Sequence, residues 1–128
     1  MKKILLAFLC LMAIPANAAT IGQPIVSVQT STASSSLVVK SSSGLLNGFS
    51  ATAGGTSGYI LIFDLASVPS NGTVTPRFCY ALPANQTTGA SWLTYPVNFN
   101  NGIVIEFSST GCFTATSSAT AFLSAQYQ

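Results

Sequence analysis

Apolar and polar residues alternate most clearly between Asn101 and Thr114, where a turn signal opens a strand that ends in a glycine corner with a cysteine. Successive side chains of a strand point to opposite faces. One face is therefore a core face formed by Ile103, Ile105 and Phe107, and the other holds Val104, Glu106 and Ser108. We predict that this stretch is the central strand of the fold.

The remaining chain shows the same pattern of short apolar stretches separated by glycine, proline, serine and asparagine. Strands are predicted over residues 37–40, 45–52, 58–64, 73–82, 89–94 and 120–127. The stretch 58–64 is almost continuously apolar, which is typical of a strand covered on both faces. Pro76 should lie at the beginning of its strand or at a sheet edge, and residues 95–102 should form a loop.

These elements predict the fold class. About seven or eight short strands, turn signals every 8–12 residues and no helical period indicate an all-β protein. We expect residues 37–128 to form a single antiparallel β-sandwich or jelly-roll.

Residues 19–36 form a Ser/Thr-rich arm that precedes this domain. A short apolar alternation at Ile25, Val26 and Val28 interrupts its polar composition. The arm alone buries too little apolar surface to offset about 1–2 kcal/mol of backbone entropy per ordered residue. We expect it to be ordered only when it pairs with a sheet edge, either its own or that of another subunit.

The first 18 residues have the pattern of a cleaved secretory signal helix. Lys2 and Lys3 precede an apolar run over residues 4–14, and Ala16 to Ala18 form a small-x-small cleavage site. An uncleaved membrane anchor is the alternative, but it needs about 20 apolar residues. We predict an exported protein that starts at Ala19 and is periplasmic, extracellular or on a cell or virion surface.

Cleavage also changes the charge. Lys40 and Arg77 then stand against Asp64 and Glu106, so the formal net charge is zero. Two cations are too few for binding to nucleic acid or to a charged membrane surface. A neutral surface favours association, and so a protein partner or self-association is expected.

The mature chain retains Cys79 and Cys112, since Cys10 lies within the signal. An even pair of cysteines in an exported chain predicts a disulfide. The chain-entropy model gives it a stabilising effect on the order of 3.5 kcal/mol. Metal binding by two cysteines without histidine is a poor alternative, and no metal or cofactor is expected.

Catalytic groups are scarce. The chain has no histidine, which excludes Ser-His-Asp and Cys-His arrangements. Asp64 and Glu106 are the sole carboxylates and could form a glycosidase pair. They could equally point outward or pair with Lys40 or Arg77, so we predict no enzymatic activity and no catalytic residues.

Aromatic residues supply the remaining candidate binding site. Trp92, Tyr95 and Phe99 lie near one predicted loop, and an exposed platform of such rings would suit a glycan or a protein. Packing within the core and loops is the alternative role of these side chains.

Two resemblances extend this interpretation. The run GIVIEFSSTGCFT at 102–114, together with GYILIFD at 58–64, Val74-Thr75-Pro76 and Cys79, resembles a group of small exported proteins of mostly unassigned function found in bacteria and in phage-related sequences. It covers residues 45–128 and implies a compact β domain in a virion-surface or prophage-associated setting. The ending FLSAQYQ is similar to the chaperone-recognition end of chaperone-usher pilins, whose first cysteine lies nearer the start.

We therefore expect a secreted or surface-exposed, non-enzymatic structural or interaction domain that acts through protein association, such as a virion decoration or appendage subunit. A glycan-binding module that uses Trp92 and Tyr95 is one alternative, and a pilin-like subunit is another.

Overall fold

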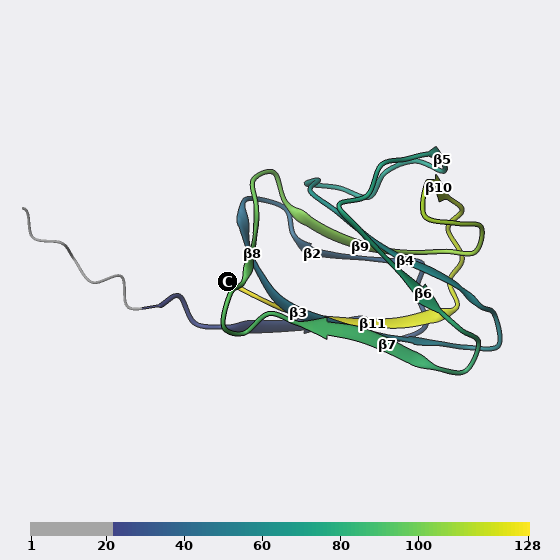
Figure 1. Ribbon diagram of the computed structural model, residues 1–128, viewed down its shortest axis with the longest axis horizontal. Helices are drawn as coiled ribbons and strands as arrows, with labels where there is room; N and C mark the ends of the chain where they lie inside the picture. The colour runs from purple at the N-terminus through teal and green to yellow at the C-terminus, as the bar shows by residue number, and fades with distance from the viewer. Residues whose placement is uncertain (1–21) are drawn as a thin grey trace, which may run out of the picture.

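The computed structural model describes residues 22–128, which fold into two antiparallel β-sheets that face each other (Figure 1). Sheet A has the strand order β1 (Val26–Gln29), β11 (Ala121–Tyr127), β3 (Gly44–Ala53) and β7 (Thr87–Ser91), and β8 (Val97–Phe99) also pairs with β3. Sheet B has the order β2 (Ser36–Lys40), β9 (Ile103–Ser108), β4 (Gly58–Phe63) and β6 (Phe78–Leu82). The predicted all-β antiparallel sandwich is thus confirmed.

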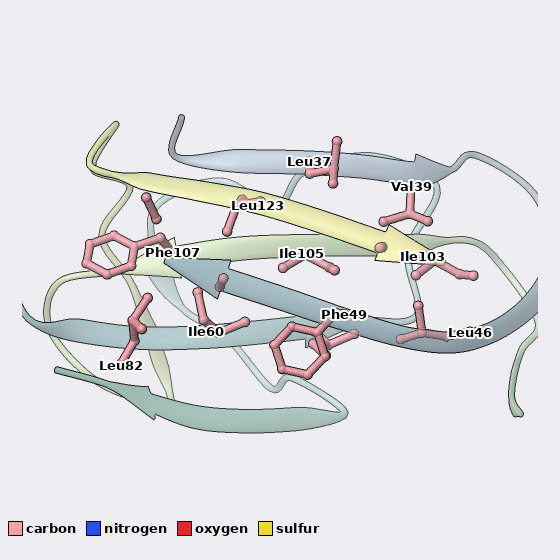
Figure 2. Close-up of a cluster of buried hydrophobic side chains, with 14 of the residues drawn as sticks. Leu37, Val39, Leu46, Phe49, Ile60, Leu82, Ile103, Ile105, Phe107 and Leu123 are labelled. Carbon is pink, nitrogen blue, oxygen red and sulfur yellow. The ribbon is translucent and has the colours of Figure 1, made fainter. Parts of the chain in front are cut away.

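The hydrophobic core lies between the two sheets, where apolar side chains from both inner faces meet (Figure 2). Its largest fully buried members are Leu46, Ile60, Ile62, Leu82, Phe99, Ile103, Ile105, Phe107 and Leu123. Each such side chain contributes about 1.5–3 kcal/mol through its removal from water. The alternation read from the sequence therefore identifies the main stabilising face of β3, β9 and β11.

The strand β9 lies between β2 and β4 and is buried on both faces, as a central strand should be. Its second face lies in a smaller apolar cluster with Leu61, Phe63 and Val104 as buried members. The outer ribbon, which we define as β5 (Gly72–Thr73) paired with β10 (Thr114–Ala115), lies beyond this face of sheet B (Figure 1). Each ribbon strand has two residues, which is too short for any periodicity in the sequence.

The predicted disulfide is confirmed. Cys79 in β6 is bonded to Cys112, which lies just before β10, and their Cα atoms are 5.6 Å apart. The bond therefore fastens the connection between β9 and β10 to the edge of sheet B.

Several predicted boundaries were wrong. The strand expected over 89–94 is β7 (Thr87–Ser91), because Trp92 makes the last hydrogen bond to β3 and the following residues leave its edge. The loop expected over 95–102 contains β8, which resumes the pairing with β3. The stretch 73–82 is split around Pro76 into β5 and β6, and the described residues contain eleven strands in place of seven or eight.

The arm described from Gly22 onward pairs with the sheet edge of its own chain. Residues Val26 to Gln29 pair antiparallel with β11 in the register Val26↔Tyr127 to Gln29↔Ser124. The backbone N–H of Thr30 donates to the carbonyl of Leu123 at 2.9 Å, which extends this pairing. Val28 packs against the main core, whereas the rest of β1 is exposed.

The predicted signal helix and its cleavage site, residues 1–18, lie outside the described residues. Within residues 22–128, the structure contains no helix of the length and apolarity needed to cross a membrane.

Candidate interaction surface

The strands of sheet A contain none of the few charged residues of the described chain, although Lys40 reaches the end of β11 at Tyr127 and Arg77 reaches β8 at Asn98 and Phe99. Between residues 22 and 128 the charged side chains are Lys40 in β2, Asp64 after β4, Arg77 before β6 and Glu106 in β9. The outer face of these strands is therefore uncharged, and covering it costs less than covering ionised groups, provided that its hydroxyl and amide groups find hydrogen-bond partners.

The outer face of sheet A is built from small hydroxyl residues, glycine and glutamine, together with one aromatic residue, Phe122. Its residues are Ser27, Gln29, Gly48, Ser50, Thr52, Thr87, Gly89, Ser91, Phe122, Ser124 and Gln126. The register places them in rows across the strands, and one row runs from Ser27 through Gln126 and Gly48 to Ser91. Such groups can donate and accept hydrogen bonds but do not titrate near neutral pH.

This face is hollowed into a shallow trough of about 420 Å³ that spans β1, β11, β3 and β7. Glycine and serine at Gly48, Ser50 and Ser124 keep its centre low. No lining residue of the trough is charged, so it offers a contact surface and no acid-base chemistry.

The predicted aromatic site is not one exposed platform. Trp92 is half-buried, and its ring packs against Phe49 and Phe78 with centroid separations of 6.2 and 5.6 Å. Phe99 is fully buried, and the Arg77 guanidinium lies 4.7 Å from its ring centroid. Tyr95 alone of the three is open to solvent, with 84% of its surface exposed.

Tyr95 and its neighbour Leu93 protrude from the loop between β7 and β8. Leu93 is 59% exposed, which is unusual for an apolar side chain beside a packed tryptophan. The loop over residues 92–96 thus adds two exposed apolar side chains to the edge of sheet A that β7 and β8 form.

The two carboxylates occupy opposite environments. Asp64 accepts hydrogen bonds from the backbone N–H groups of Asn101 at 2.7 Å, Asn100 at 3.2 Å and Gly102 at 3.4 Å. The bond from Asn101 is the largest cause that lowers the pKa of Asp64. Its role is to hold the turn between β8 and β9, since the carboxylate satisfies three donors there.

Glu106 is fully buried on the outer-ribbon side of β9, which corrects the expectation that it could point outward. Burial raises the pKa of its carboxyl group. One oxygen, Oε1, accepts a hydrogen bond of 2.7 Å from the Ser117 hydroxyl, and Oε2 has no hydrogen-bond partner. The cavity beside Asp64 is not lined by Glu106, so the two carboxylates do not face a shared space there.

Asp64→Asn should lower the free energy of unfolding at neutral pH by roughly 1 kcal/mol, the order of a partly exposed hydrogen bond. A lowered pKa stabilises the fold above the ordinary value of 3.8, and this contribution is lost as the pH falls through the lowered pKa. The variant should therefore lose part of the acid sensitivity of the wild type, measured as thermal midpoints at neutral pH and below pH 3.8. An unchanged acid sensitivity would contradict this assignment.

No family model, curated protein or solved structure significantly matches this chain. The candidate surface therefore rests on the geometry alone. One feature of the sequence could have indicated this surface. Small polar residues alternate with apolar ones, and no charged residue occurs, over residues 44–53, 87–91 and 121–127.

Proposed function

We propose that this protein is an exported, non-enzymatic structural or interaction subunit that acts through association with other proteins. The observation that supports this best is the uncharged outer face of sheet A, because its trough is lined by uncharged residues and β1 and β7 at its edges contain no charged residue. A neutral surface of this kind promotes association and gives little electrostatic repulsion between copies.

The confirmed disulfide is compatible with export, since such bonds persist in oxidising compartments. The resemblance to small exported and phage-related proteins adds a setting on a cell or virion surface, where the domain would serve as a decoration or appendage subunit. The environments of Asp64 and Glu106 agree with a non-enzymatic role, because one carboxylate holds a turn and the other is buried.

Size-exclusion chromatography with light scattering tests this proposal on protein purified after export of the full chain. We expect the average mass to rise with concentration and to change little with added salt, because screening acts on charges that this surface lacks. A monomer at every concentration that binds a neutral sugar, with binding lost in Tyr95→Ala, would contradict the proposal and favour the glycan-binding alternative.

A further inference from the structure

The edges of the two sheets differ in their protection against pairing with another chain. An open edge strand is a template for such pairing, and proteins block it with charge, proline or bulges. In sheet B, β2 has a register shift before the charged Lys40, and β6 holds the disulfide to Cys112. In sheet A, β1 and β7 contain no charge and no proline, and their registers are regular.

We propose that copies of this chain associate head to tail through sheet A, with β1 of one copy paired to β7 of the next. This inference rests on the proposed function, and it specifies that the protein partner is a second copy of the chain. It joins two different edges, so the contact is heterologous and each copy keeps one free edge for further growth.

Strand direction permits this junction. Each neighbouring pair along β1, β11, β3 and β7 is antiparallel, and so β1 and β7 run in opposite directions. A second copy placed beside the first in the same orientation therefore brings its β7 antiparallel to β1. The alternation of strand directions continues across the junction without a change of pairing type.

The hydrogen-bonding groups at the two edges also match in their pattern along the strands. In an antiparallel pair, the residues that bond to the partner strand alternate with residues whose peptide groups point the other way. Thr30 bonds to β11 and Trp92 bonds to β3, so the peptide groups of Ser27, Gln29, Gly89 and Ser91 point away from the sheet. All four belong to the outer face, and paired residues keep their side chains on one face of a continuous sheet.

Exposed apolar residues fall at the same level on both sides of the junction. The row from Ser27 to Ser91 runs straight across sheet A, so an unshifted second copy places Ser91 opposite Ser27. Ile25, just before β1, is 49% exposed and Val26 is 43% exposed. They then lie level with the neighbouring loop over residues 92–96, which holds the exposed Leu93 and Tyr95.

Two proline variants test the pairing, because each removes an outward N–H group that the chain's own sheet does not use. Ser27→Pro blocks the β1 edge and Ser91→Pro blocks the β7 edge. We expect the apparent association constant, measured by sedimentation over a concentration series, to fall at least about tenfold in each variant alone. An equimolar mixture should recover dimers that grow no further, since each variant keeps the edge that the other lacks.

Different results separate the possibilities. If the wild type associates and both variants associate equally well, the pairing is wrong although the proposed function stands. If one variant alone loses association and mixing restores nothing, the contact is between two identical edges, and head-to-tail pairing is wrong. If the wild type remains monomeric throughout, the proposed function fails together with the pairing.

Lysine variants preserve the test if proline disturbs folding. Ser27→Lys and Ser91→Lys add an edge charge, and Ser42→Lys in the exposed turn before β3 is the matched control. Tyr95→Ser should also weaken association, whereas Phe113→Ser, which removes a side chain 67% exposed beside the outer ribbon, should not. Equal effects of edge and control variants would overturn the pairing.

Discussion

Replacing both Cys79 and Cys112 by serine should lower the free energy of unfolding by on the order of 3.5 kcal/mol. The disulfide spans a sequence separation of 33 residues, and the unfolded chain regains the freedom of that loop when the bond is absent. The free energy of unfolding of a small domain is about 5–15 kcal/mol in total, so the disulfide contributes a large share of it.

Denaturant unfolding monitored by the fluorescence of Trp92 measures this loss. Reduction of the wild type should reproduce the double variant, and the same reductant should leave the double variant unchanged, which provides the control. Mass spectrometry before and after reduction should differ by about 2 Da, the mass of two hydrogen atoms. Quantitative labelling of both thiols in native, non-reduced protein would refute the bond in solution.

The second large effect is expected for Glu106→Gln, which should stabilise the protein at neutral and alkaline pH. The carboxyl group is fully buried, and Oε2 has no hydrogen-bond partner among the described residues. Glutamine has a similar shape, keeps an acceptor for Ser117 and removes the ionisable group. Above the raised pKa we expect a gain of about 1.4 kcal/mol for each unit by which burial raises the pKa, because glutamine needs neither a buried charge nor an added proton there.

The sign of the pH dependence follows from the direction of the pKa shift. Because burial raises the pKa of Glu106, the folded state holds its proton more tightly than the unfolded state. The stabilising contribution is complete below the ordinary value of 4.5 and is lost as the pH rises through the raised pKa. The wild type should thus lose stability over this window, and Glu106→Gln should not.

No histidine titration overlaps this window, because the chain has no histidine. The free energies of unfolding should converge below pH 4.5 and separate once the pH exceeds the raised pKa. Ser117→Ala is the matched control, because it removes the hydroxyl that donates to Glu106 and should destabilise the protein. Parallel pH profiles of wild type and Glu106→Gln would contradict the assignment.

The parts of the fold that could be predicted are those governed by a repeating local pattern. The alternation in residues 103–108 and 121–127 identified β9 and β11 almost to the residue, because burial of one face fixes period 2. The disulfide could be predicted because two cysteines remain after the signal segment and they allow a single pairing.

The remaining features depend on contacts between distant parts of the chain. Glu106 is buried because the segment that contains Ser117 and the outer ribbon lie over β9, and neither has a periodic signal. Phe99 and Tyr95 have similar local sequence surroundings. Phe99 nevertheless lies in β8, pairs with β3 and is buried, whereas Tyr95 lies in the loop before β8 and is exposed. The candidate surface was missed because it consists of serine, threonine and glycine, which sequence patterns assign to turns.

The pairing of β1 with β11 has a kinetic consequence. Val26 and Tyr127 are neighbours in sheet A although 100 residues separate them, and β3 also pairs with β11. β3 can pair with β7 and β8 earlier, but β1 has no partner and β3 lacks its second neighbour until β11 has been synthesised, so sheet A cannot be completed step by step during translation. Folding dominated by such distant pairs is slow, on the order of milliseconds to seconds. The newly made chain should therefore remain unfolded long enough for chaperones or a translocation channel to engage it.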